Sequence, residues 1–373
     1  GKTISYLLGW AQAVIYYPAS IAAAAAIFST QFLNLFGIEK KYSILVGACA
    51  ATTVTGLNLL GSKASGRIQT VATICKLIPI IAIIVFGLLQ PNPTTIELFP
   101  TSSSSSSSTP LAALGAAMLA AMYGYDGWSN VGTIAGEMKN PKKDLPKAIT
   151  VGIIGVCIIY LIINLAYLYV LPAGILVKTS TPAADVASIL LGKGIGAKLI
   201  TVGILISVFG TLNGSVLIST RIPYIMALHN ELPYSKKFTK LHPKFKTSFA
   251  SFVLMFVIGG TMTFLGTFNT LADMAMFSWW IFNVLAFVGV IKFRKDCPDI
   301  ERPYRVPLYP FVPIVAIIGG MVVLVSALIT QTVLALTGLA LTGSGMIVYY
   351  FVKRNEGNEQ INLEKNLRKS RRK

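Results

Sequence analysis

The feature that most constrains this chain is a succession of long apolar runs. A helix of about 20 apolar residues spans the hydrocarbon core of a bilayer. Hydrophobic residues make up 54% of the 373 residues and charged residues 12%, whereas a soluble domain is typically about 25% charged. The sequence therefore predicts an all-α membrane protein with ten transmembrane helices, at residues 5–36, 43–61, 69–89, 111–136, 148–171, 194–226, 248–266, 269–291, 310–330 and 333–352.

The net charge of +18 is distributed unevenly between the two sides of the predicted bundle. With ten spans both ends lie on one side, and most of the 32 Lys and Arg residues fall there. The opposite side carries Lys40, Lys41, Lys178, Lys193 and Lys198. This bias predicts a multi-pass protein of the cell membrane with both ends in the cytoplasm. Because the basic residues are spread over several loops and a tail, we expect the lipid bilayer as a partner and no nucleic acid.

The fourth span carries a carboxylate near its middle, in the sequence MLAAMYGYDGWSNVGTIAGE at residues 118–137. An ionised Asp at the centre of an unbroken span costs about 2.5–3.5 kcal/mol. Gly124, Gly127 and Gly132 surround Asp126, and glycine is a poor helix former. We therefore predict a broken helix whose freed backbone groups line a cavity and bind a small zwitterion. Asp126 would cap a second half-helix, about residues 128–138; an intact kinked helix with Asp126 paired to a neighbour is the alternative.

Two further spans carry polar groups. Lys76, in TICKLIPI, either extends to the cytoplasmic interface or places its ammonium in a cation site within the bundle. Ser207, Thr211 and Ser215 are spaced by four and share one helix face. Such a face points at protein or at a cavity, and helix–helix hydrogen bonding is the alternative. The spans contain no set of nucleophile, base and metal ligands, so we expect neither an enzyme nor a cofactor or metal.

The stretch GYDGWSNVGTIAGEMKNPKKDLPKAI resembles the L-type amino acid transporter (LAT) family of the APC (amino acid–polyamine–organocation) superfamily. TICKLIPI, FGTLNGSVLISTR and PDIERPYRVPLYP resemble other segments of that family, so the resemblance covers nearly all of residues 1–352. It implies the leucine-transporter-type fold of twelve helices, two inverted five-helix repeats and two more. The ten spans would correspond to helices 3–12, so we expect a longer protein. Residues 1–352 would form one transporter domain and 353–373 a basic cytoplasmic tail.

The resemblance also implies a binding site. It makes Tyr123 an aromatic gate over the substrate and Trp128 the lower edge of the break. Lys76, with Tyr160 near it, would stand where sodium-coupled members of the fold hold sodium. The substrate pocket would be lined by Tyr123, Gly124, Tyr125, Asp126, Gly127, Trp128, Ser129, Ser20, Ala24, Thr211, Ser215 and Trp279.

From these residues we expect a bacterial-type, sodium-independent transporter, an exchanger of small neutral L-amino acids that works by alternating access. Animal members of the family pair with a glycoprotein through a cysteine in the loop after helix three. Here that loop reads GIEKKYS, so no disulfide-linked subunit is expected. The alternatives are a proton-coupled symporter in which Lys76 or Asp126 titrates, and a sensor or channel-like protein on the same fold.

Overall fold

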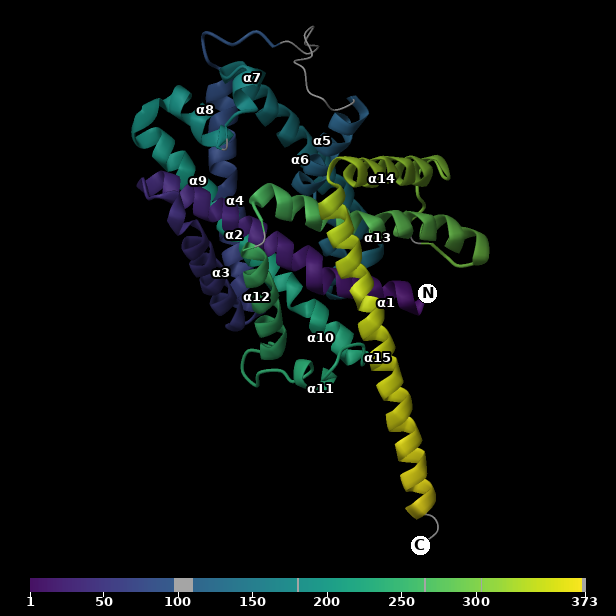
Figure 1. Cartoon of the computed structure of the whole chain (residues 1–373). Helices are drawn as coiled ribbons and strands as arrows, with labels where there is room; N and C mark the ends of the chain where they lie inside the picture. The colour runs from purple at the N-terminus through teal and green to yellow at the C-terminus, as the bar shows by residue number, and fades with distance from the viewer. Residues whose placement is uncertain (97–109, 180, 265, 303, 371–373) are drawn as a thin grey trace.

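The computed structural model (Figure 1) describes residues 1–96, 110–179, 181–264, 266–302 and 304–370. Every regular element of these residues is helical. In chain order the elements are α1 (Lys2–Ala11), η1 (Gln12–Tyr16), α2 (Tyr17–Phe36), η2 (Lys40–Tyr42), α3 (Ser43–Leu59), α4 (Ser62–Leu88), α5 (Pro110–Gly124), η3 (Trp128–Glu137), α6 (Pro141–Val170), α7 (Ala173–Leu176), α8 (Pro182–Leu191), η4 (Gly192–Gly196), α9 (Ala197–Ser219), α10 (Arg221–Leu228), α11 (Ser235–Phe238), α12 (Phe249–Thr263), α13 (Phe268–Asp296), α14 (Phe311–Thr330) and α15 (Thr332–Ser370).

The prediction of an all-α membrane fold is confirmed. Each of the ten predicted spans falls on one or more helices. Within the described residues, eight helices are long and apolar enough to cross a membrane: Lys2–Phe36, Lys40–Leu59, Ser65–Leu88, Pro141–Val170, Lys198–Leu228, Phe268–Asp296, Phe311–Thr330 and Thr332–Lys353. The other two predicted spans correspond to the shorter α12 and to α5 with η3. The short helices α7, α8 and α11 lie in predicted loops, where runs of four to ten residues carry too little periodicity to be recognised.

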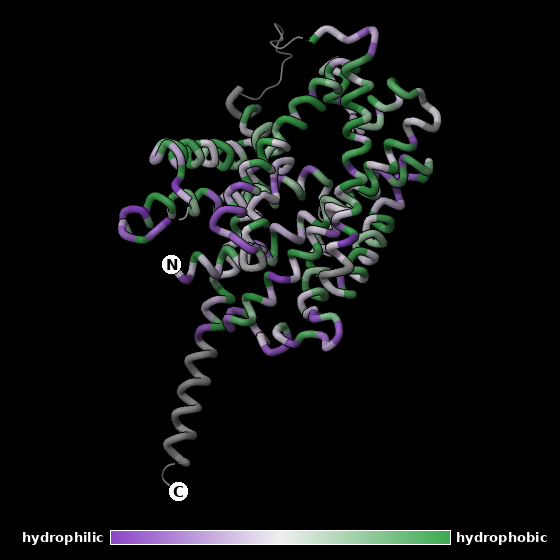
Figure 2. Tube along the Cα trace, turned by 180° about the vertical axis from the view of Figure 1, so that it is seen from behind, coloured by the Kyte–Doolittle hydropathy of each residue, from purple (hydrophilic) through white to green (hydrophobic). Residues whose placement is uncertain are grey.

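The helical surface is apolar where nothing in the chain covers it. Val151, Ile154 and Leu161 on α6 are 61%, 55% and 71% exposed. Figure 2 shows hydrophobic residues along the outer helices, with hydrophilic stretches in the connecting loops. Large contiguous apolar surfaces are rare on soluble proteins. The lipid bilayer is therefore the natural neighbour of these faces.

The first three elements, α1, η1 and α2, form one continuous helix that crosses the molecule, in purple in Figure 1. One turn of it, η1, is a π-helix. The helix packs against α3, α9, α12 and α13, and its small residues Ala22–Ala25 are buried. The alanine run thus makes this an interior helix, because small side chains let neighbouring helices approach closely.

Small residues also bring α4 and α9 together. A Cβ added to Gly210 would lie 2.5 Å from the Cβ of Ala72, and one added to Gly203 would lie 2.8 Å from the Pro79 ring. Neither position on α9 can carry a larger side chain without a shift of α4. Close backbone approach is the usual basis of helix association in lipid.

A cluster of buried amides ties α3, α4 and α9 together. The side chain of Asn213 is fully buried; its Oδ1 accepts from Asn58 Nδ2 at 2.9 Å, and its Nδ2 donates to the Ser65 carbonyl at 3.1 Å and to Gln69 Oε1 at 3.2 Å. The group joins two consecutive helices, α3 and α4, to α9, which is far from them in the sequence. We refer to Asn58, Ser65, Gln69 and Asn213 as the amide cluster.

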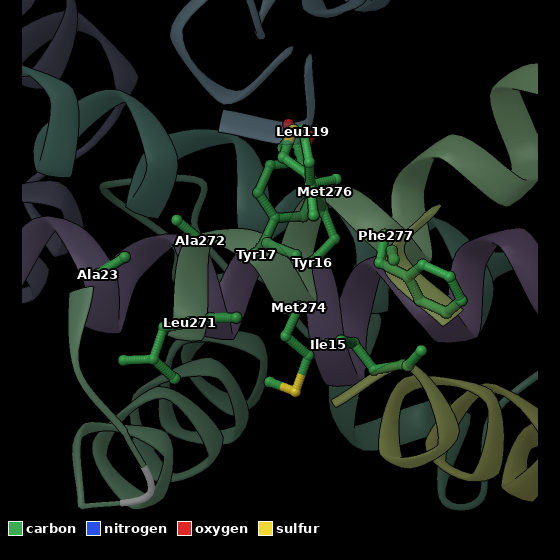
Figure 3. Packing of buried hydrophobic residues seen from close by; sticks show 14 of the residues in the cluster. Ile15, Tyr16, Tyr17, Ala23, Leu119, Leu271, Ala272, Met274, Met276 and Phe277 are labelled. Atoms are coloured by element: carbon green, nitrogen blue, oxygen red, sulfur yellow. The ribbon is translucent and has the colours of Figure 1, made fainter. Parts of the chain in front are cut away.

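The largest hydrophobic core lies where α2, α5, α13 and α14 meet. Figure 3 shows Ile15, Tyr16 and Tyr17 of the long helix close to Met274, Met276 and Phe277 of α13. This core places the two tyrosines beside α5, and α5 leads into the predicted break.

Two sequence predictions are left without a structural test. The low-complexity run TSSSSSSSTP at 101–110, whose composition predicts an external loop, lies almost entirely outside the described residues. The division into a domain at 1–352 and a tail at 353–373 stays a prediction, because α15 continues as one helix to Ser370.

Candidate functional site

The predicted break in the fourth span is present. Helix α5 ends at Gly124, Tyr125–Gly127 form a turn, and the backbone continues as η3. Gly127 has a φ of 103°, a value that side chains on L-residues rarely allow and that glycine adopts freely. Gly127, the residue after Asp126, therefore permits the chain to turn between α5 and η3.

The segment after the break differs from the prediction. A half-helix at about 128–138 was expected, and the structure has a 3-10 helix over Trp128–Glu137. Its Val131, Gly132, Thr133 and Gly136 are weak helix formers. Runs of 3-10 helix longer than three or four residues are uncommon, and such a stretch often marks a hinge.

Tyr160 of α6 stabilises the broken end of α5. Its hydroxyl donates to the Gly124 carbonyl at 2.8 Å, and its ring meets the Tyr125 ring edge to face at 5.0 Å. The last carbonyls of a helix have no partner within the helix, and an unpaired carbonyl in the membrane costs several kcal/mol. Tyr160 thus satisfies one of the groups that the break sets free.

Asp126 is bound from the long helix. The Tyr16 hydroxyl donates a hydrogen bond to Asp126 Oδ2, while the Tyr16 ring stacks on Trp279 of α13 at 4.8 Å. The neighbouring Tyr17 hydroxyl donates to Asn130 Oδ1 at 3.1 Å. The carboxylate was expected to cap the second half-helix, and here a tyrosine hydroxyl from another span binds it. The alternative, an intact kinked helix with Asp126 paired to a neighbour, is wrong about the helix, which is broken, although Asp126 does have such a partner.

Two cavities, of about 230 and 310 Å³, meet at the break. Tyr125, Asp126 and Trp128 line both of them. Trp279, Trp280 and Asn283 of α13 complete the smaller cavity, together with Met118, Ala121 and Met122 of α5. Polar and aromatic groups therefore surround an irregular stretch of backbone. Sites for small ligands in membrane carriers are typically built in this way.

The larger cavity contains both signs of charge. Lys76 of α4 and Asp126 are the charged residues among those that line it, and Gly124 and Tyr160 line it as well. Within the described part of the chain, the one ion pair is Lys41–Glu39 at the surface, so Lys76 and Asp126 do not pair with each other. A cation and an anion beside one cavity suit a ligand that carries both charges.

The structure brings together only part of the predicted site. Gly124, Tyr125, Asp126, Trp128, Trp279, Lys76 and Tyr160 line the two cavities. Ser129 is at the break, and its Oγ is buried without a hydrogen-bond partner among the described residues. Tyr123 packs on Phe268, with the rings edge to face at 5.6 Å. A gating role for Tyr123 stays a prediction.

Seven predicted pocket residues line neither cavity. Tyr123, Gly127 and Ser129 belong to the segment around the break, whereas the other four lie on α2 and α9: Ser20, Ala24, Thr211 and Ser215. Ser20 donates to the Tyr16 carbonyl at 2.7 Å within its own helix, and Ala24 packs in the small core around Leu212 and Val216. Thr211 donates to the Ser207 carbonyl in its own helix. A role for these four residues in substrate binding stays a prediction.

Sequence reasoning missed several residues of the site. Tyr16 and Tyr17 occur in an apolar run where aromatic residues usually signal core packing, and nothing nearby marks them as partners of Asp126 and Asn130. Trp280 and Asn283 follow the predicted Trp279 on α13. The spacing of four between Trp279 and Asn283 was an available signal, because residues four apart share a helix face; no such signal marked Trp280.

A helix broken at a carboxylate, with a lysine on the same cavity and within an all-helical membrane bundle, is typical of the class of secondary transporters. The sequence model of the family described as "Amino acid permease" matches residues 1–352. The chain therefore belongs to the amino acid permease family of the APC superfamily.

Individual relatives are amino acid exchangers and transporters. The chain is 38% identical to the serine/threonine exchanger SteT of Bacillus subtilis (strain 168), over 96% of this chain and 80% of that protein. It is 28% identical to the cystine/glutamate transporter of Homo sapiens, over 94% of this chain and 69% of that protein. It is 27% identical to the large neutral amino acids transporter small subunit 2 of Mus musculus, over 94% and 66%.

Proposed function

We propose that the protein exchanges small neutral L-amino acids across the membrane, without sodium, by alternating access. The observation that carries the proposal is the cavity at the break, which Asp126 and Lys76 both line. Its volume of about 310 Å³ lies at the small end of the range of ligand sites, about 300–1,000 Å³. The likeness to a serine/threonine exchanger supports a substrate of that size.

The break supplies partners for both ends of an amino acid. Backbone N–H and C=O groups that leave a helix at membrane depth bind the carboxylate and the ammonium. Tyr125 and Trp128, which line both cavities, would enclose a short side chain. Lys76 would supply a fixed positive charge next to the break, and a fixed ammonium makes a bound sodium ion redundant.

A proton-coupled symporter is the second candidate. It is favoured by the carboxylate of Asp126, which is the acidic residue among the lining residues of both cavities and accepts a hydrogen bond from Tyr16. A proton that binds and leaves this carboxylate during the cycle would couple transport to the proton gradient. Uptake by an exchanger should depend on amino acid inside the vesicle, whereas uptake by a proton-coupled symporter should depend on the pH gradient.

The setting of the transporter is also a proposal. We place it in the cell membrane with both ends of the chain in the cytoplasm, on the basis of the basic loops. The loop after the first span of this chain reads GIEKKYS and contains no cysteine, so we propose a carrier without a disulfide-linked subunit.

The test is uptake of labelled L-serine into proteoliposomes. An exchanger should show saturable uptake that rises severalfold when the vesicles contain unlabelled L-serine and that is unchanged when choline replaces sodium. Uptake that follows an inward proton gradient in empty vesicles would instead establish the symporter. A strong sodium requirement would overturn the role given to Lys76, and flux that does not saturate would indicate a channel.

A further inference from the structure

A second, apolar groove lies away from the break and is lined by residues of α2, α4 and α9. Its volume is about 620 Å³, and every residue that lines it is apolar except Arg67. Phe28, Phe32 and Phe36 of α2 and Phe209 of α9 form much of its wall. We call it the phenylalanine groove.

The groove follows one face of α2 and is open to the outside. Phe28, Phe32 and Phe36 are spaced by four, so they follow one helix face over about 12 Å. Their neighbouring ring centroids lie 6.1 and 4.7 Å apart. Phe36 and Val71, which both line the groove, are 61% and 60% exposed. An uncovered apolar channel of this length fits an extended hydrocarbon chain.

Arg67 gives the groove one charged end. It lies five residues after Ser62, the start of α4, which is about 7.5 Å along the helix. Its side chain is exposed, and within the described part of the chain no acidic side chain pairs with it. A guanidinium can form two parallel hydrogen bonds to a phosphate.

The depth of Arg67 matches a lipid headgroup. It lies two residues after Ser65, the start of the apolar span Ser65–Leu88, on the side of the bundle with the excess of Lys and Arg. That side faces the cytoplasm under the positive-inside rule, and the cytoplasmic leaflet attracts basic residues through its anionic lipids.

We propose that the phenylalanine groove is a binding site for an anionic phospholipid of the cytoplasmic leaflet. The phosphate pairs with Arg67, and one acyl chain runs from it toward the middle of the bilayer along Ile68, Val71 and Phe28. The site is separate from the two cavities at the break, since no residue lines both the groove and a cavity.

The test is native mass spectrometry of the purified protein with phosphatidylglycerol and phosphatidylcholine of the same acyl chains. The wild type should retain phosphatidylglycerol in preference to phosphatidylcholine, and Arg67→Gln should lower that preference about fivefold, as expected for one basic contact near the surface. Lys240→Gln removes one exposed charge from a loop on the same side and should leave the preference unchanged.

A second variant tests the hydrocarbon part of the site. Val71→Trp adds a large side chain at an exposed position in the groove and should lower retention of both lipids, while uptake of L-serine reports that the variant is folded. Equal losses in Arg67→Gln and Lys240→Gln would overturn the site in favour of general charge. Displacement of the bound lipid by inorganic phosphate alone would show that only the charge is recognised. A dimer that Val71→Trp abolishes would show that a second copy of the chain covers the groove. Either result would overturn the lipid site.

Discussion

The contact between α4 and α9 and the break between α5 and η3 both place polar groups inside a membrane bundle, and they treat those groups in opposite ways. In the amide cluster, the side-chain amide of Asn213 forms hydrogen bonds with Asn58, Ser65 and Gln69. At the break, Asp126 and the turn around it line cavities. Polar groups that are satisfied by protein hold helices together, whereas groups left facing a cavity are available to a ligand.

The glycines of the two regions, Gly210 and Gly127, are needed for different reasons. Gly210 of α9 is needed for space, because a Cβ there would meet Ala72 at 2.5 Å. Gly127 is needed for backbone conformation, because its φ is 103° and a Cβ would meet its nearest atom only at 3.9 Å. Substitution at the first position should therefore affect packing, and substitution at the second should affect the shape of the site.

The largest expected effect is on exchange, from Gly127→Ala. A non-glycine residue in such a conformation costs about 1–3 kcal/mol, so L-serine exchange should fall by up to about a hundredfold if the strain is relieved by reshaping the turn. Gly132→Ala is the matched control, since its Cβ would meet nothing within 4 Å and its φ is ordinary. Equal activity in the two variants would show that the turn at Gly127 does not matter for transport.

The second largest effect on exchange is expected from loss of the hydrogen bond between Tyr16 and Asp126. Tyr16→Phe removes the hydroxyl but keeps the ring that stacks on Trp279. A hydrogen bond to a charged group contributes about 1.5–3 kcal/mol, so exchange per folded protein should fall about tenfold. Tyr17→Phe removes the hydroxyl bound to Asn130 and should have a smaller effect; the opposite order would assign the role to Tyr17.

A smaller effect, on stability alone, is expected in the amide cluster. Asn213→Ala leaves Asn58 and Gln69 without this partner and should lower the free energy of unfolding by about 1–2 kcal/mol. Thermal unfolding in detergent measures it. Thr261→Ala is the control, because Thr261 is exposed and bonds only within its own helix. A large loss of exchange in Asn213→Ala at unchanged stability would contradict the purely structural role that we expect for the amide cluster.

The smallest effect is expected from Tyr160→Phe. The variant loses the hydrogen bond to the Gly124 carbonyl but keeps the ring contact with Tyr125. A neutral hydrogen bond contributes about 0.5–1.5 kcal/mol, so exchange should fall about threefold. Unchanged exchange would show that water satisfies this carbonyl equally well.

The break could be predicted because its signal is local. A charge between glycines in an apolar run is visible in a few letters around Asp126, and the helix does end at Gly124. The partners of the break could not be predicted in the same way. Tyr16 lies 110 residues from Asp126 and Asn58 lies 155 residues from Asn213, and one sequence holds no record of which distant residues meet. The 3-10 form of η3 was missed because pattern reasoning places a helix more reliably than it defines its type.

The π-turn η1 has a geometric consequence for the long helix. Each added residue rotates the face of an α-helix by about 100°, so the wider turn at Gln12–Tyr16 shifts the phase between α1 and α2. On one side of it Tyr6 meets Tyr349 of α15, with ring centroids 4.7 Å apart; on the other, Tyr16 reaches Asp126. A single-residue deletion within η1 would restore the regular ladder and turn one half of the helix away from its neighbours. The ring contact of Tyr6 and the hydrogen bond of Tyr16 are therefore linked by a helix rotation that no single side chain sets.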